Sequence, residues 1–460
     1  MRKLFTIRWK TKQSLAFINP IFCTVVFCVI IHSCPFAQQM QWPQPSQLLP
    51  GGFNPFAPQT PSPSPYTRPT LQNFIEQEQI RRNSQQQQIL EEVNQEIEKL
   101  NRKELEWAHQ TRAYHEAYDS LLLLNPDSFS LSKAVFIAEN AFYDNGYKYA
   151  DFQQVLQRNA ALVRQVVMRE GLSEKNDLAL NYGIMKLYRQ PNNYYNAQTK
   201  QSKTVEPFGY DFEDFTGKRD YSKMFALKAL ATRKGQCHSL PLIYLMLAEQ
   251  LHAKAWLSLA PQHSFIQFMD GNNNLLNFET TNGQLVSSAW LQQSGFINAN
   301  ALRMGTFLDT LSSRRLYAQC MVDLLNGFIF RFGDDNYLAK EMTQKILKID
   351  SNNLSANIIK ANRLTANAMK KITEAGRPKL KALPNYPDAY DAWQQMQQAY
   401  EKVDALGYQD MPREAYNAWL KSINTQQQRQ ATKEAQQRMQ QEMQRLKTLK
   451  VTVTNNPRKK

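Results

Sequence analysis

Cys237 and His263 supply the two residue types that covalent catalysis by a thiol needs, a nucleophile and a base. A cysteine attacks through its thiolate, and the unpaired N–H groups at a helix N-terminus favour that anion. Cys237 lies in the segment GQCHSLP, where Pro241 fits only the first turn of a helix and Gly235 lets the chain bend into it. The segment therefore predicts a helix that begins near Cys237 and a thiol placed where a thiolate is favoured.

Two predicted strands follow the cysteine and bring the histidine together with a carboxylate. His263–Met269 and Leu275–Glu279 have strand character, and the polar run Asp270–Asn274 between them predicts a hairpin turn. This run lacks the remaining carboxylates of a calcium loop, so we interpret it as a turn only. We expect an antiparallel hairpin that begins at the histidine and ends at the glutamate.

The centre of that turn decides which residues face one another across the hairpin. If Gly271 is the centre, Glu279 lies directly opposite His263, with Cβ atoms roughly 5 Å apart on one face. Asn277 lies on the same face, one step diagonal. The sequence thus predicts a Cys–His–acid triad of Cys237, His263 and Glu279, with Asn277 as the alternative orienting residue.

Smaller roles are expected for the other polar groups near the cysteine. His238 is next to Cys237 but should project elsewhere on the helix. The backbone N–H of Cys237 is a better candidate donor to an oxyanion than the Gln236 side chain. No set of residues has metal-ligand spacing and no cofactor motif is present, so neither a metal nor a cofactor is predicted.

The residues that must position the triad are expected to form one domain over 128–310. Ser130 suits the N-cap of an amphipathic helix, and two further helices follow it. The segment Pro191–Lys218 has few periodic apolar residues and predicts a long surface loop. Helices that outweigh a few strands indicate an α+β fold that is mostly helical, with a small antiparallel sheet.

The chain after residue 310 predicts helices only. Over 311–375, antiparallel helices with short polar connections have lengths that resemble tetratricopeptide hairpins. A helical extension is expected over 376–428. The rest, 429–460, is Gln-rich and basic and predicts a frayed or solvated tail.

The first residues predict export rather than a folded unit. Residues 1–37 combine a basic start, the apolar stretch Phe17–Ile31 and a small-residue cleavage point, as a signal peptide does. A retained membrane anchor and lipid attachment at Cys34 are the alternatives. An extended Pro/Gln-rich linker is expected over 38–70, and a solvated Gln-rich spacer helix, rather than a dimerisation zipper, over 71–127. We therefore expect the periplasm or cell envelope, with membrane attachment through the apolar stretch as the alternative to release.

The net charge of +15 would suit a nucleic-acid partner, but its distribution argues against one. Five basic residues precede the first apolar run, and nine basic against two acidic residues lie beyond residue 428. The middle of the chain is close to neutral and has no basic groove with interleaved aromatic residues. We expect a protein or peptide partner, held by the C-terminal helices, and no nucleic acid.

Cysteine usage excludes a disulfide scaffold. Cys23, Cys28 and Cys34 belong to the leader, so only Cys237 and Cys320 remain in a mature chain. Cys320 lies in an apolar helical pattern and is expected to be buried.

The segments GQCHSLP, PQHSFIQ and NFETTNG resemble the helix-start, histidine-strand and acid-strand positions of the transglutaminase-like superfamily. Asp220–Gly283 is similar to a bacterial subgroup related to the SirB-type family, and the likeness covers about Ser128–Lys371. It implies a papain-type core with a small antiparallel sheet, followed by tetratricopeptide-like helices. It also implies Cys237 as nucleophile, His263 as general base and acid, and Glu279 at the third position.

Two features bear on that resemblance. The superfamily usually has Asp followed by Pro at the third position, where this chain has Glu279-Thr280, so Asn277 stays an alternative orienting residue. SirB-related proteins often lack the cysteine, and such members are not expected to act as thiol enzymes. This chain retains Cys237, which favours activity.

We therefore expect an exported cysteine hydrolase that cleaves an amide or peptide bond through an acyl-enzyme on Cys237, with acyl transfer if an amine replaces water. The alternative is a catalytically inactive envelope scaffold, transglutaminase-like with tetratricopeptide-like helices, that binds protein partners. A third hypothesis, a helical adaptor, requires Cys237 and His263 to lie far apart.

Overall fold

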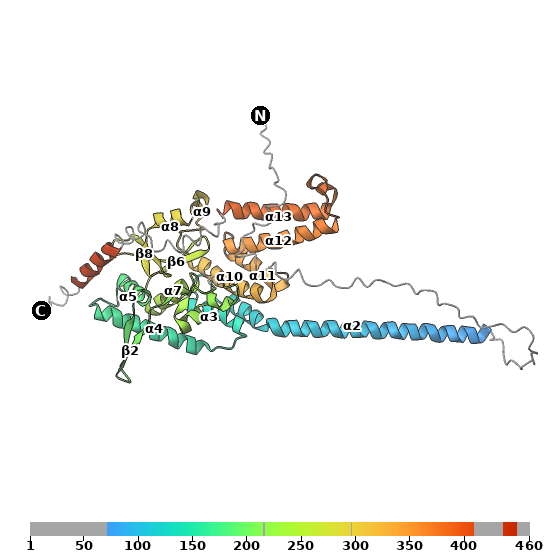
Figure 1. Cartoon of the computed structure of the whole chain (residues 1–460), viewed down its shortest axis with the longest axis horizontal. Coiled ribbons are helices and arrows are strands. Elements are labelled where there is room, and N and C mark those ends of the chain that lie inside the picture. The colour runs from blue at the N-terminus through green and yellow to red at the C-terminus, as the bar shows by residue number, and fades with distance from the viewer. Residues whose placement is uncertain (1–70, 215–216, 296, 409–435, 449–460) are drawn as a thin grey trace, which may run out of the picture. The chain divides into compact units, whose positions relative to one another are not determined.

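The computed structural model describes residues 71–214, 217–295, 297–408 and 436–448 (Figure 1). The predicted leader and linker, and the predicted helical extension beyond residue 408, lie outside these residues. The chain divides into two units, one of Val29–Thr111 and the other of Met1–Cys28 with Arg112–Lys460.

The described residues of the first unit all belong to α2 (Leu71–Leu122), which occupies most of the predicted spacer segment. Between Gln72 and Gln110 no residue is buried, and the apolar side chains of Val93 and Ile97 are exposed. In the second unit, the last turns of α2 are part of the apolar core, where Tyr114 and Leu121 are fully buried.

Three amphipathic helices open the second unit where the sequence predicts them. They are α3 (Leu131–Asn140), α4 (Tyr149–Arg169) and α5 (Asp177–Arg189). Ser130 caps α3 as expected, because its Oγ accepts a hydrogen bond from the Lys133 N–H at 3.3 Å. All three helices contact α7 (Ser239–Leu251), an apolar helix at the centre of the core.

The segment Pro191–Lys218, expected as a long loop, contains a hairpin instead. Its strands β1 (Asn192–Asn196) and β2 (Gln201–Val205) pair antiparallel. Gln165 of α4 holds the hairpin, donating to the Tyr195 carbonyl at 2.7 Å and accepting from the Tyr195 N–H at 2.9 Å. The strands have no alternating apolar pattern and depend on contacts with α4, which explains why the sequence prediction was wrong.

Short elements lead from this hairpin to α7: β3 (Gly209–Tyr210), η2 (Tyr221–Met224), α6 (Ala226–Thr232) and β4 (Lys234–Gly235). Strands β3 and β4 pair parallel. Gly235 is required by close packing, since a Cβ there would lie 2.7 Å from Ser239 Oγ and 2.9 Å from Ala229 Cβ. The glycine that the sequence assigns to a bend is therefore required because α6 and α7 approach each other closely.

Four antiparallel strands form the sheet that carries the histidine: β5 (Trp256–Ala260), β6 (His263–Met269), β7 (Leu275–Glu279) and β8 (Gln284–Val286), in that order. Strands β6 and β7 lie where the hairpin strands are predicted, and β8 is additional. Phe268 and Phe278 on one face pack against Tyr244 of α7, with ring centroids 6.5 and 5.5 Å away. This contact places the sheet directly on the helix that follows the cysteine.

The β6–β7 hairpin differs in register from the expected one by two residues. Asn273, with φ 63°, takes the left-handed place in the turn, so the loop is centred one residue beyond Gly271. The predicted direct opposition of His263 and Glu279 is therefore wrong. A shift of two residues nevertheless leaves every side chain on its face, so the two residues lie diagonally on the same side of the sheet.

The remaining elements are helical: α8 (Ser288–Ser294), α9 (Ala299–Arg303), α10 (Ser313–Phe332), α11 (Tyr337–Ile349), α12 (Leu354–Glu374), η3 (Leu380–Asn385) and α13 (Pro387–Ala405). Helices α12 and α13 lie side by side (Figure 1). Cys320 in α10 is a free thiol and is 1% exposed, as expected. The described chain is thus mostly helical with small antiparallel sheets, which confirms an α+β fold at that level.

A further helix over 436–448 packs on the second unit. Met439 and Met443 are buried in the core, and Gln436 Nε2 donates to Gln284 Oε1 of β8 at 3.0 Å. The expectation of a frayed or solvated tail is therefore wrong for these residues. Two methionines one turn apart give this helix an apolar face that the core covers.

Candidate active site

Cys237 immediately precedes His238, the N-cap residue of α7. The Cys237 Sγ donates a hydrogen bond to the Gln262 carbonyl at 3.7 Å. Its backbone carbonyl accepts a hydrogen bond from Ser264 Oγ at 2.7 Å, so the second residue of β6 holds the start of α7. Pro241 is the third residue of the helix, as its missing N–H demands, and the cysteine lies at a helix N-terminus as predicted.

His263 is the first residue of β6 and Glu279 is the last residue of β7. The His263 Nε2 and the Glu279 Oε2 are 2.5 Å apart, and both side chains are 0% exposed. The other carboxylate oxygen accepts hydrogen bonds from the Thr281 N–H at 3.0 Å and from the Thr281 hydroxyl at 2.8 Å. Glu279 is thus held on both sides and fixes the orientation of the imidazole.

The imidazole lies close to the cysteine, since the residues on both sides of His263 hydrogen-bond to Cys237 and the two side chains interact electrostatically. Because Nε2 is engaged by Glu279, Nδ1 is the ring nitrogen that can face the sulfur. The three predicted residues therefore lie together, with Glu279 bonded to His263 and Cys237 held against the residues on either side of it. A helical adaptor with the cysteine and histidine far apart is contradicted.

Charge within the pair favours the protonated histidine. Burial opposes protonation of His263, but the Glu279 charge and the hydrogen bonds with Cys237 and Glu279 outweigh it and raise the pKa of His263 to about 10. Burial likewise opposes ionisation of Glu279, yet His263 and Thr281 lower the pKa of this carboxyl below its ordinary value. The two residues are an imidazolium–carboxylate pair at neutral pH.

Asn277 lies on the predicted face but does not orient the histidine. Its Oδ1 accepts a hydrogen bond from Gln267 Nε2 at 2.9 Å, and its Nδ2 donates to Ser288 Oγ at 2.9 Å. Of the two alternatives that the sequence left open, Glu279 is the residue in contact with His263.

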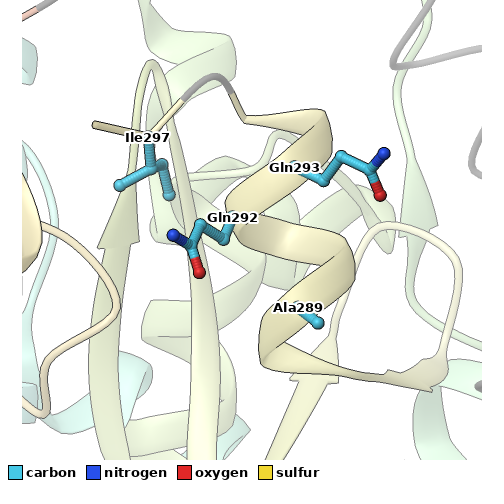
Figure 2. Close-up of a pocket in the computed structure, with 4 residues that line it drawn as sticks. All are labelled: Ala289, Gln292, Gln293 and Ile297. Atoms are coloured by element: carbon cyan, nitrogen blue, oxygen red, sulfur yellow. The ribbon is translucent and has the colours of Figure 1, made fainter. Parts of the chain in front are cut away.

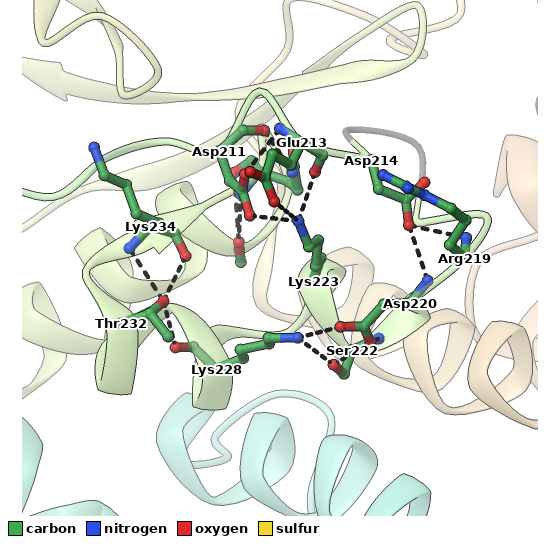
Figure 3. A network of polar contacts seen from close by, with 12 residues as sticks. Asp211, Glu213, Asp214, Arg219, Asp220, Ser222, Lys223, Lys228, Thr232 and Lys234 are labelled. Atoms are coloured by element: carbon green, nitrogen blue, oxygen red, sulfur yellow. Dashed lines mark hydrogen bonds and ion pairs between the residues drawn. The ribbon is translucent and has the colours of Figure 1, made fainter.

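Lys223 holds the loop between β3 and α6 through contacts with two acidic residues (Figure 3). Lys223 Nζ lies 3.1 Å from Asp211 Oδ2 and 3.5 Å from Glu213 Oε2. The Asp211 carbonyl accepts a hydrogen bond from the Gln236 Nε2 at 2.8 Å. One N–H of the Gln236 amide is therefore engaged by this loop.

One charged contact beside the cysteine was missed by the sequence analysis. His238 Nε2 lies 3.0 Å from Asp323 Oδ1, which belongs to α10. Sequence reasoning placed His238 away from the site and assigned Asp323 no role. No local pattern could have paired them, because the contact exists only where α10 packs near the start of α7.

The site is closed to solvent. Cys237 is 7% exposed, and the His263 and Glu279 side chains are fully buried. An open pocket of about 410 Å³ lies at α8, apart from the triad, and is lined by Ala289, Gln292, Gln293 and Ile297 (Figure 2). In this conformation a substrate carbonyl therefore has little access to the sulfur.

Two further features are absent from the described residues, a metal-binding group and a membrane-spanning helix. No group of three or more His, Cys, Asp or Glu side chains there is arranged to hold a metal ion. In the same part of the chain, no helix combines the length and the apolar character needed to span a membrane.

Comparison with known proteins adds little to this geometry. No family model matches the sequence, and no curated protein matches it. Among solved structures, a crystal structure of menin, described as revealing the binding site for the Mixed Lineage Leukemia (MLL) protein, is similar with a TM-score of 0.30 and 12% sequence identity. The match covers 67% of this chain and 74% of the menin chain. A likeness at this level supports no conclusion about fold or function.

Proposed function

We propose that this chain is an exported transglutaminase-like cysteine hydrolase that acts on an amide or peptide bond. The observation that supports the proposal is the buried His263–Glu279 pair beside Cys237, whose sulfur and carbonyl contact the residues on either side of His263. A nucleophile, a base and an orienting acid in this order are the parts of a thiol hydrolase.

Each residue has a defined step in the proposed reaction. The Cys237 thiolate attacks the carbonyl carbon, and a tetrahedral oxyanion forms. The C–N bond then breaks as the His263 imidazolium transfers its proton to the leaving amine, which leaves an acyl-enzyme. His263, now neutral, takes a proton from water, whose hydroxyl displaces the thiolate and releases the acid. Glu279 keeps the ring oriented and stabilises its charged form throughout.

The oxyanion needs a donor at the start of α7. The backbone N–H of Cys237 lies there, and within the described residues it has no hydrogen-bond acceptor. A backbone donor at a helix N-terminus, supported by the helix dipole, suits a developing negative charge. One of the two N–H donors of the Gln236 side chain is already engaged by the Asp211 carbonyl, which makes it the weaker candidate.

Alkylation of the native chain tests the proposal directly. At pH 6 an ordinary thiol is almost entirely protonated, and one that is 7% exposed should react more slowly when folded than when unfolded. We expect iodoacetamide to label Cys237 at least about tenfold faster in the native chain than in urea, because His263 stabilises the thiolate. Cys320, whose pKa burial raises well above its ordinary value, should stay unlabelled until the chain unfolds.

Two variants complete the experiment. His263→Ala should remove the native acceleration, whereas His252→Ala should retain it, because His252 is at the opposite end of α7. Labelling of Cys237 that is no faster in the native chain than in urea would exclude a thiol enzyme.

The closed site supports a second candidate, a catalytically inactive scaffold that binds protein partners. In that case the buried His263–Glu279 pair is part of the core and Cys237 is a packed side chain. Cys237→Ala would then leave every partner recovered in a pull-down and leave the phenotype unchanged. Loss of the phenotype with partners retained would favour the hydrolase.

Export and partner binding are proposed from the sequence of the chain. The basic and apolar leader supports translocation, and the helices α10 to α13 are candidates to hold a protein or peptide partner. Fractionation of cells that express the full chain tests the location: recovery in the cytosol would exclude export.

A further inference from the structure

A second histidine–carboxylate pair lies beside the nucleophile. His238 follows Cys237 in the chain, and its Nε2 is 3.0 Å from Asp323 Oδ1 of α10. The His238 side chain is 22% exposed and that of Asp323 is 12% exposed, so solvent screens their interaction only in part. Cys237 is thus flanked by the pair His263–Glu279 and by the pair of His238 with Asp323.

The groups around this second pair leave His238 as its positive member. Glu139 of α3 also interacts with His238 electrostatically, and its carboxylate accepts hydrogen bonds from the first two N–H groups of α6, at 2.8 Å each. The Tyr221 hydroxyl of η2 and the Cys320 thiol interact with Asp323, and burial raises the pKa of both groups well above the ordinary value, so they stay neutral. Burial raises the pKa of Glu139 to about 8, so the Asp323 carboxylate and the His238 imidazolium are the charges of this group at neutral pH.

His238 and Cys237 influence one another electrically. Burial opposes protonation of His238, but Asp323 first, then Cys237 and Glu139, raise the pKa of His238 to about 9. Coupling between two titrating groups is reciprocal, so if the cysteine favours the charged histidine, the charged histidine favours the thiolate.

We propose that His238, kept charged by Asp323, is a positioning residue that stabilises the thiolate of the neighbouring Cys237. This inference rests on the proposed thiol chemistry and adds a second source of its electrostatics. Asp323 belongs to α10, so its contact with His238 also links the site to the first of the long C-terminal helices.

The pH dependence of Cys237 alkylation in the folded full chain tests the proposal. His238→Gln removes the charge, and we expect it to move the midpoint of the rate profile upward by about one pH unit, a tenfold loss of rate below the midpoint. His238→Arg keeps a positive charge and should keep the midpoint of the unsubstituted chain. His252→Gln is the matched control and should change nothing.

The outcomes separate this inference from the proposed function. If the unsubstituted chain already has the midpoint of an ordinary thiol, the proposed function fails. Two results would overturn the role assigned to His238 while the hydrolase survives. One is a low midpoint in the unsubstituted chain that His238→Gln leaves in place. The other is a midpoint that His238→Arg raises as much as His238→Gln does. A purely structural role would lower rates without moving the midpoint.

A measurement on the unsubstituted chain covers the case in which the variants do not fold. Methyl methanethiosulfonate converts the Cys237 thiol to an uncharged methyl disulfide with release of methanesulfinate. Loss of the thiolate should lower the pKa of His238, followed by histidine-selective NMR, by about half a unit or more. An unchanged titration of His238 would overturn the proposal.

Discussion

Glu279 takes part in the most completely buried charged contact of the site. It neutralises the imidazolium of His263 where solvent does not reach, and Thr281 satisfies its second oxygen. Removal of one member of such a pair leaves the other buried without a partner, which costs far more than the net contribution of the intact pair. Stability and reactivity should therefore depend on the same residue.

Glu279→Gln should lower the free energy of unfolding by about 3 kcal/mol at pH 6. The stabilisation from Glu279 is present above its ordinary pKa of 4.5 and is lost as the pH falls through its lowered value. The stabilisation from His263 is complete below its ordinary pKa of 6.5 and is lost as the pH rises towards about 10. Urea denaturation should thus show the largest difference in free energy of unfolding between the variant and the unsubstituted chain from pH 4.5 to pH 6.5.

An exposed ion pair provides the control for this prediction. Arg315 Nη1 and Asp309 Oδ2 are 2.9 Å apart, but the two side chains are 26% and 53% exposed. Asp309→Asn should therefore cost less than about 1 kcal/mol. Equal losses for the Asp309 and Glu279 variants would contradict the importance of the buried pair.

At the scale of elements, the site depends on how β6 docks against the start of α7. Ser264 Oγ makes one of these contacts, a buried hydrogen bond to the Cys237 carbonyl at 2.7 Å. The neighbouring Gln262 has φ 56°, a left-handed conformation that is uncommon for a residue other than glycine, and its carbonyl faces the sulfur. The residues on both sides of His263 therefore contact Cys237.

Ser264→Ala should lower the free energy of unfolding by about 1–2 kcal/mol, because the Cys237 carbonyl is left without its donor. It should also slow native alkylation of Cys237, since the start of α7 is no longer held against β6. Thermal denaturation and peptide mapping measure the two effects. Ser313→Ala, which removes an exposed hydrogen bond of 2.8 Å to the Pro126 carbonyl, should change stability by less than about 0.5 kcal/mol.

The positions of the helix and the strands near the site were largely predictable from the sequence, but the register of the hairpin was not. Pro241 placed the helix start, and the apolar pattern placed β6 and β7. The register was missed because Asn273, rather than Gly271, provides the left-handed residue of the turn, and an asparagine in this conformation has no unique sequence signal. The error of two residues in register left Glu279 on the predicted face of the sheet, since side chains alternate with a period of two.

At the scale of the whole molecule, segments distant in sequence dock on the domain that carries the triad. The end of α13 contacts α9 through hydrogen bonds from Asn298 Nδ2 to the Gly407 carbonyl at 3.1 Å and from Thr306 Oγ1 to the Leu406 carbonyl at 2.7 Å. The helical extension is thus fastened to the residues that follow the sheet.

Gly407→Ala should break this docking. A Cβ at Gly407 would lie 2.3 Å from the Ala301 backbone nitrogen, and its φ of 80° already disfavours any side chain. We expect a loss of about 3 kcal/mol, from backbone strain and the clash together, with faster hydrogen exchange in α9. Gly376→Ala is the matched control: its φ is 79° but nothing lies within 4 Å, so it should cost only about 1 kcal/mol.

By itself, the sequence determined the helix that begins at Cys237, the strand that begins at His263 and the face shared with Glu279. These follow from proline geometry and side-chain periodicity, which act within a few residues of the chain. Tertiary structure alone decided that Glu279 and not Asn277 contacts the imidazole, that the site is closed, and that His238 meets Asp323. Such contacts join residues from separate elements, and packing of the whole core sets their distances.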